Sequence, residues 1–242
     1  MQRLTAGLDQ QIKIFSPSGD LHQIDYAQMA VASENTTVAL KTIHTAVVAT
    51  QKRIADKTIV PQSLKYLFAT TPRVGCCATG RIADARYQQR WAINEASKFR
   101  YTFGYDISAR VLCERLADMN QIYSMHSEIR SLGCSIILID YDGEGRPTVH
   151  MTEPTGEYNS YKGCALGPNA DKAEAYLEQH LQTHMSEEKS LQLAIDCLST
   201  AMDIEFEPLH LEVGVVSKAH PEFRMLDANE IASQLYNIAR QT

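Results

Sequence analysis

The chain has 242 residues, of which 44% are hydrophobic and 21% charged, and this composition suits a globular domain with a sizeable core. The formal net charge is −6, and the basic residues form no run or stripe, which argues against nucleic-acid binding. The opening MQRLTAGLDQQ has no apolar run typical of a signal peptide, and no apolar stretch approaches the roughly 20 residues that span a bilayer.

The first stretch with a definite pattern runs from residue 8 to residue 33. Residues 16–19 (SPSG) predict a turn, because proline presets one φ angle and glycine accepts a positive one. Asp20 is a candidate N-cap for the amphipathic helix that follows. On pattern alone this stretch equally fits the first hairpin and helix of any α+β domain. The apolar positions of the helix are Leu21, Ile24, Ala27, Met29 and Ala30.

After this stretch, groups of strands alternate with pairs of helices. The last helix has a capping-box start at Asp227 and Glu230. Of two earlier helices, one is expected to follow a cap at Asn169 and the other to follow Ser186. We expect strands at 38–40, 46–49, 65–68, 74–78, 134–139, 148–152, 163–167, 211–216 and 223–226, and a helix pair at 82–101 and 108–125.

This order predicts an α+β fold built as a four-layer α-β-β-α sandwich of two antiparallel sheets. The short connections between the strands favour antiparallel pairing. No linker or internal repeat interrupts the pattern, so residues 1–242 are expected to form a single domain.

The six cysteines are scattered, and most lie in apolar segments. This arrangement favours buried, reduced thiols over a disulfide framework, and hence the cytoplasm or nucleus. Cys76 and Cys77 are adjacent on a strand and cannot face the same side, so they are not expected to form a redox pair. The others are Cys113, Cys134, Cys164 and Cys197.

Two histidines have a spacing that could suit a metal site. His180 and His184 are four residues apart on an expected helix, which would place both imidazoles on one face. No HExxH acid lies between them, and we expect a solvated helix surface and no metal or other cofactor.

The residue string of the first stretch resembles the N-terminal signature of alpha-type subunits of the 20S proteasome, [YF]-D-R-x-x-x-x-F-S-P-x-G-x-L-x-Q-[VI]-[ED]-Y-A. Leu8 stands where the family has an aromatic residue, and Gln10 where it has arginine. The matching positions are Asp9, Phe15, Ser16, Pro17, Gly19, Leu21, Gln23, Ile24, Asp25, Tyr26 and Ala27.

The resemblance continues along nearly the whole chain. Two stretches look like the subtype at the first position of the alpha ring: residues 198–204 (LSTAMDI) and 212–216 (EVGVV). The other matching segments are 80–86 (GRIADAR), similar to G-x-x-A-D-[AS]-R; 104–105 (GY); 130–133 (RSLG), similar to R-P-x-G with Ser131 in place of proline; and 153–156 (EPTG), similar to D-P-x-G.

The resemblance implies the N-terminal-nucleophile hydrolase sandwich but not its catalysis. Enzymatic members use an N-terminal threonine, freed by cleavage after glycine and aided by an aspartate and a lysine. Here Glu34 and Asn35 precede Thr36 and Thr37, and the register of residues 39–41 places the nucleophile position at Asn35. Where catalytic relatives carry A-D-x-R, residues 50–53 read TQKR. We therefore expect no catalytic residue.

The resemblance also implies two sites on the surface. Residues matching Leu8, Asp9, Pro17 and Tyr26 form a cluster that holds a pore gate open in the family. The plainer alternative is that Pro17 and Tyr26 only shape the turn. Positions matching Asp25, Lys65 and Gly80 line an inter-subunit pocket for the C-terminal carboxylate of activator subunits, for which a lysine ammonium is an apt partner.

The expected function is therefore a non-catalytic structural and gating subunit of the outer alpha ring, in ubiquitin-dependent and ubiquitin-independent protein degradation. Residues 1–33 would form the gate arm and a docking helix. The expected partners are other alpha subunits in a hetero-heptameric ring, beta-ring subunits, and the C-terminal tails of regulatory ATPases or other activators. Two alternatives remain open, a self-processing N-terminal-nucleophile hydrolase and a stand-alone homo-oligomeric binding protein.

Overall fold

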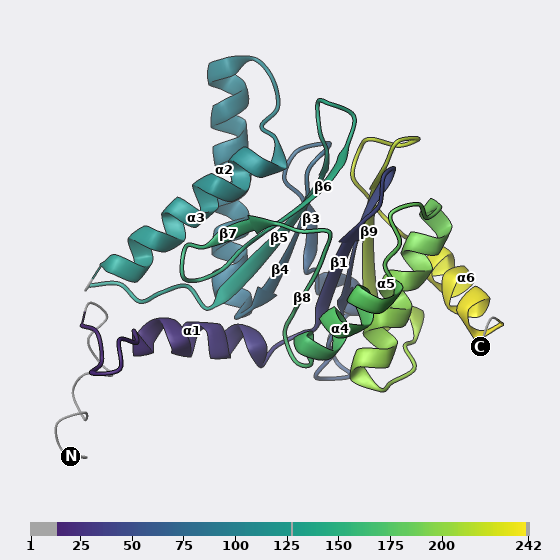
Figure 1. Cartoon of the computed structure of the whole chain (residues 1–242), viewed down its shortest axis with the longest axis horizontal. Helices are drawn as coiled ribbons and strands as arrows, with labels where there is room; N and C mark the ends of the chain where they lie inside the picture. Colours follow the sequence, from purple (N-terminus) through teal and green to yellow (C-terminus); the bar gives the residue numbers. More distant parts are fainter. Residues whose placement is uncertain (1–13, 127, 241–242) are drawn as a thin grey trace.

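Two five-stranded antiparallel sheets lie face to face between two layers of helices (Figure 1). The computed structural model describes residues 14–126 and 128–240. The predicted α-β-β-α sandwich of two antiparallel sheets is confirmed, with its order of strands and helix pairs.

The first sheet is covered on its outer face by three helices from the second half of the chain. Their inward residues, such as Ala194 and Ile195, are fully buried against Val47 and Leu40. The strand order is β10 (Arg224–Met225), β9 (Leu211–Ser217), β2 (Thr45–Gln51), β1 (Thr37–Lys41) and β8 (Gly163–Leu166). The helices are α4 (Ala170–His180), α5 (Glu187–Met202) and α6 (Ala228–Ala239).

The second sheet is covered by one antiparallel helix pair. Small alanines on the inner face of the first helix, including Ala92 and Ala96, allow close packing on the strands. The strand order is β3 (Leu67–Ala69), β4 (Gly75–Gly80), β5 (Cys134–Tyr141), β6 (Pro147–Thr152) and β7 (Tyr158–Ser160). The helices are α2 (Ile82–Phe103) and α3 (Ala109–Met125).

The core between the sheets explains the continuous apolar run of β5. Ile136 and Leu138 pack toward the helices, whereas Ile137 and Ile139 face the other sheet. The strand is thus covered on both faces and needs no polar side. Cys76 likewise packs toward the helices and Cys77 toward the other sheet, so the two thiols face opposite sides, as the sequence predicted.

Helix α1 (His22–Ala32) lies across one end of the second sheet, near β4 and β5 (Figure 1). The predicted turn before it is confirmed: Gly19 has φ +95° and donates its N–H to Ser16 O at 2.9 Å. The prediction that Asp20 caps the helix is wrong. Leu21 holds the N-cap position, and the Asp20 carboxylate instead accepts a 2.6 Å bond from the Ser18 hydroxyl, which stabilises the turn.

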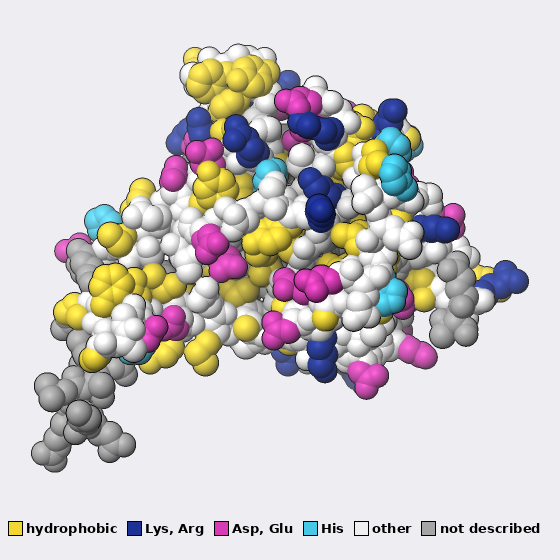
Figure 2. Space-filling view, in the orientation of Figure 1, with side chains coloured by type: hydrophobic (Ala, Val, Ile, Leu, Met, Phe, Trp, Pro, Cys, Tyr) yellow, Lys and Arg dark blue, Asp and Glu magenta, His cyan; other side chains and the backbone are white. Residues whose placement is uncertain are grey.

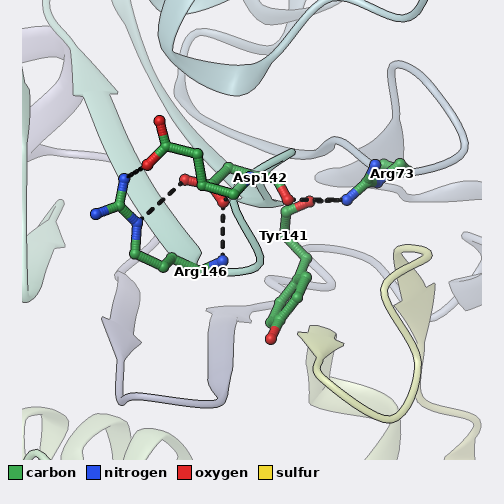
Figure 3. Close-up of polar contacts among 5 residues, drawn as sticks. Arg73, Tyr141, Asp142 and Arg146 are labelled. Carbon is green, nitrogen blue, oxygen red and sulfur yellow. Dashed lines mark hydrogen bonds and ion pairs between the residues drawn. The ribbon is translucent and has the colours of Figure 1, made fainter.

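The hairpin turn between β5 and β6 is fixed by two arginines (Figure 3). Arg73, from the β3–β4 turn, donates to the carbonyl oxygens of Tyr141 and Asp142. Arg146 donates its backbone N–H to the Asp142 carboxylate at 2.8 Å. Two neighbouring turns are thereby held together at one end of the sandwich.

Three further details differ from the sequence analysis. β7 was missed, because all three of its residues are exposed and lack an apolar alternation. Asn169 does precede α4, but it adopts a left-handed conformation and its side chain does not cap the helix. The helix α4 ends at His180, so His184 lies in the following loop and the two histidines do not share a helix face.

Two of the motifs that carry the family resemblance contact each other. Asp84, in the first turn of α2, accepts bonds of 2.6 and 2.7 Å from the Arg130 guanidinium and one of 2.9 Å from Gly133 N. Its side chain is 7% exposed. Burial acts to raise the pKa of Asp84, but these donors outweigh it and hold the pKa below its ordinary value.

We expect Asp84→Asn to lower the free energy of unfolding by about 1–3 kcal/mol, because a buried charge-assisted pair is replaced by a poorer one. Since the folded pKa is depressed, this stabilisation is present above the ordinary aspartate pKa of 3.8 and is lost as the pH falls below it. Urea unfolding of both proteins between neutral pH and pH ~3 checks this, and a difference independent of pH would contradict it.

Candidate functional site

Lys65 stands at the mouth of a surface pocket of about 360 Å³. The pocket lies between β9, the start of α6 and two short 3-10 turns, η1 (Pro61–Ser63) and η2 (Pro208–His210). Apart from Lys65, its polar lining consists of Lys52, Gln62 and Glu212. The apolar lining consists of Pro61, Pro208, Leu209, Leu211, Val213, Met225, Leu226, Ala228 and Ile231. The pocket therefore combines apolar walls with few charges.

The charged residues of the pocket are not equivalent. Lys52 Nζ lies 3.0 Å from Glu212 Oε1, and these side chains are only 10% and 13% exposed. Lys65 is exposed, and its ammonium has no ion pair or hydrogen bond among the described residues. The Glu212 carboxylate is therefore paired with the Lys52 ammonium, whereas the Lys65 ammonium remains available to a ligand.

Glu212 also joins the two sheets. It belongs to β9 of the first sheet, and its Oε2 accepts the backbone N–H groups of Tyr66 at 2.8 Å and Leu67 at 3.1 Å. Tyr66 directly follows Lys65, and Leu67 is the first residue of β3 in the second sheet. The carboxylate thus fixes the backbone on which Lys65 is mounted.

Gly80 has a structural reason to be glycine. It is the last residue of β4, whereas Lys65 lies two residues before β3, and Gly80 is not among the residues that line the pocket at Lys65. Gly80 has φ +122°, and a Cβ there would collide with Gly133 O and lie 2.7 Å from Cys134 Cα. The predicted role in ligand binding stays a prediction beside this packing role.

Asp25, the third predicted pocket residue, lies on α1 and is exposed, with its carboxylate 3.6 Å from His22 Nδ1. It thus comes from an element different from those that carry Lys65 and Gly80. Of the three predicted residues, only Lys65 lines this pocket, and the predicted inter-subunit pocket stays a prediction.

Of the predicted gate cluster, Leu8 and Asp9 lie outside the described residues. Pro17 lies in the exposed turn before α1. Tyr26 is 48% exposed, and its ring stacks on His22 at a centroid distance of 6.4 Å. The surface of α1 therefore offers Tyr26 for contacts outside the chain.

A hydrogen-bond network surrounds Asn35, the residue at which the sequence register predicted the family's nucleophile position. Thr37 Oγ1 lies 2.7 Å from both Thr50 Oγ1 and Thr79 Oγ1, which joins the two sheets. Asn35 Nδ2 donates to Thr50 Oγ1 at 2.7 Å, and Thr36 donates to Pro168 O at 2.8 Å. All these hydroxyls have partners, and the side chains are buried.

The remaining candidates from the sequence are the cysteines and the two histidines. Burial raises the pKa of all six thiols, which keeps them protonated near neutral pH. His180 stacks on Tyr176 at 4.1 Å and bonds to its carbonyl oxygen. Within residues 14–126 and 128–240, no three His, Cys, Asp or Glu side chains are grouped to hold a metal.

In the same ranges, no helix has the length and hydropathy needed to cross a membrane.

Sequence reasoning missed Lys52 and Glu212 as pocket residues. Lys52 entered it only as part of the TQKR segment, and Glu212 only as the first letter of EVGVV. Because 160 residues separate the pair along the chain, no local pattern indicated the contact.

Comparison with known proteins agrees with the geometry. A family model described as "Proteasome subunit" matches residues 31–216, and a model of the N-terminal signature of A-type proteasome subunits matches residues 9–30. The chain is 37% identical over 240 residues to proteasome subunit alpha type-6 of Caenorhabditis elegans, covering 98% of each protein.

Two further relatives show how widely the likeness extends. The chain is 33% identical to the probable proteasome subunit alpha type-1 of Schizosaccharomyces pombe, over 97% of this chain and 98% of that protein. It is 31% identical to the proteasome subunit alpha of Thermococcus sibiricus, over 95% of this chain and 87% of that protein. The similarity therefore covers the arm, the sandwich and the pocket together.

We expect Gly80→Ala to lower the free energy of unfolding by about 2–5 kcal/mol, because it combines a strained φ with a backbone collision. Gly104→Ala is the matched control: Gly104 also has a positive φ, +81°, but a Cβ there meets open space. It should cost about 1 kcal/mol. Denaturant unfolding measures both, and equal losses would show that the Gly133 contact is unimportant.

Proposed function

This chain belongs to the proteasome family and is an alpha-type subunit of the 20S core particle, and on that premise we propose that it forms a non-catalytic part of the outer ring that contributes to the gate and docks activators. The observation that carries the docking part is the Lys65 ammonium, unpaired among the described residues, at an apolar pocket. Such a pocket suits a chain-terminal carboxylate that follows an apolar residue.

The hydrogen-bonded state of the inter-sheet threonines supports the non-catalytic part of the proposal. Proteasomal catalysis needs a threonine with a free amino group. Here Thr36 and Thr37 continue from α1 through Ser33, Glu34 and Asn35, and their hydroxyls bond to fixed partners. Alpha-type subunits are in general non-catalytic parts of the proteasome, and this arrangement agrees with that role.

The exposed side of α1 supports a place at a ring interface and beside the gate. Met29 is 66% exposed, Phe15 65% and Tyr26 48%, although the helix packs on the sheet through Ala27 and Val31. Apolar side chains gathered beside one helix are typical of a surface that another subunit covers. In the proposal, α1 packs against neighbouring alpha subunits, and the residues before it contribute to the gate.

A second apolar surface lies at the opposite end of the molecule. Tyr101, Phe103 and Tyr105 are 94%, 54% and 62% exposed, and Figure 2 shows the hydrophobic side chains gathered at the upper tip over α2. Assembly with other proteasome subunits follows from the family. We assign this tip to contact with a beta-ring subunit, because exposed aromatic side chains are frequent anchors in stable interfaces.

The proposal includes protein degradation with and without ubiquitin, in the cytoplasm and the nucleus. Six buried cysteines without disulfides suit these reducing compartments.

We expect the mature chain to retain the residues before Thr36, because nothing should cleave it there. Mass analysis of the protein from its native source measures this, and a chain beginning at Thr36 or Thr37 would support the self-processing hydrolase instead.

Co-purification should yield several different alpha chains. A particle of one chain type would favour the homo-oligomeric alternative.

We expect Lys65→Ala to weaken activator docking by about tenfold, because one charge-assisted contact is lost. The melting temperature should not change, since Lys65 is exposed and makes no ion pair in the described chain. Activator affinity of assembled particles is the measurement, with Lys98→Ala, another exposed lysine, as the matched control. Unchanged affinity in Lys65→Ala would contradict the docking role.

A further inference from the structure

The same pocket contains a charge arrangement that the docking role does not by itself require. Its charged lining consists of two ammonium groups and one carboxylate. Since Lys52 pairs with Glu212, the pocket is left with one uncompensated positive charge among the described residues, at Lys65. Resting on the proposed docking role, we propose that Lys52 is a specificity-determining residue, which neutralises Glu212 and thereby makes the pocket select a carboxylate over a neutral chain end.

The fold requires a hydrogen-bond acceptor at position 212, and the Glu212 carboxylate fills that role. Through it, β9 holds the start of β3, because it accepts the N–H groups of Leu67, the first residue of that strand, and of the preceding Tyr66. A buried backbone N–H without an acceptor is costly, so the carboxylate serves the joint between the sheets. It nevertheless places a negative charge in the wall of a pocket that is to receive an anion.

Lys52 resolves this conflict. Its ammonium is 3.0 Å from Glu212 Oε1, and its backbone N–H donates to His210 O at 2.7 Å, which fixes the residue beside the pocket. Without Lys52, the Glu212 charge would repel an incoming carboxylate. It would also attract the flexible Lys65 side chain, which would then be occupied.

The role is one of electrostatic positioning and not of direct binding. Coulomb interactions at a partly buried site are stronger than those in water, because the local dielectric constant is lower. A single unpaired charge therefore has a measurable effect on the affinity for a charged ligand. A ligand with a neutral end, such as a C-terminal amide, should respond little to the same change.

The experiment uses assembled particles and one fluorescent peptide that ends in two apolar residues, prepared as the free acid and as the amide. Fluorescence anisotropy gives the ratio of the affinity for the free acid to the affinity for the amide. In Lys52→Met we expect binding of the acid to fall by about tenfold while binding of the amide is unchanged. In Glu212→Gln we expect the ratio to rise, because Gln still accepts the backbone N–H groups but carries no charge.

The double variant Lys52→Met/Glu212→Gln separates electrostatics from structure. It again leaves Lys65 as the single charge, so the ratio should return to that of the unmodified particle. A merely structural role for the pair would not show this rescue. Glu95→Gln is the matched control, since it alters another partly buried pair, Glu95–Arg115, between α2 and α3, and should leave the ratio unchanged.

Each outcome has a distinct meaning. If Lys65→Ala leaves binding of the acid peptide unchanged, the docking role fails and the inference fails with it. If Lys65→Ala weakens binding but Lys52→Met keeps the original ratio, only the inference is overturned. Should Lys52→Met not assemble, an unchanged ratio in Glu212→Gln would overturn the inference equally.

Discussion

One carboxylate, that of Glu212, links β9 of the first sheet to the start of β3 in the second. Glu212 is 13% exposed, and a charge held so far from water must be paired and hydrogen-bonded to be tolerated. Lys52 and the backbone N–H groups of Tyr66 and Leu67 meet that requirement. Because these partners come from both sheets, satisfying the charge also sets the position of β3 against β9. The pocket at Lys65 is a consequence of that position.

A second joint gives a physical meaning to two of the family motifs. The segments GRIADAR and RSLG lie about fifty residues apart, yet Asp84 of the first bonds to Arg130 and Gly133 of the second. Gly80 is glycine because its φ is positive and its neighbour is the Gly133 backbone. These residues fix the point where β4 turns into α2, and α1 contacts the same end of the sheet through Ala30. The two motifs therefore stabilise the end of the sheet on which α1 packs, independently of any role in ligand binding.

The sequence predicted those features that depend on local pattern. The apolar run of residues 134–139 predicted the strand β5, which the structure covers on both faces. The capping box of Asp227 and Glu230 predicted the start of α6. Features decided by contacts that leave no apolar pattern in the sequence were missed or misplaced. Asp20 bonds to its own turn rather than to the helix, and β7 is paired through its backbone to β6 with no apolar side. The Lys52–Glu212 pair could not be predicted for the same reason.

Under the proposed non-catalytic role, the location of the polar side chains shows which parts of the sandwich stabilise the fold and which are left to bind a ligand. Between the sheets, hydroxyl groups and one amide bond to each other, so Thr37, Thr50 and Thr79 form a joint in which each hydroxyl is already engaged. At the surface the arrangement is reversed, since Lys65 carries a charge with no partner in the described chain. Buried polar groups that are fully satisfied stabilise a fold, whereas an unsatisfied exposed charge beside apolar walls favours a ligand. Under the proposed function, the same scaffold has its reactive site closed and its recognition site left open.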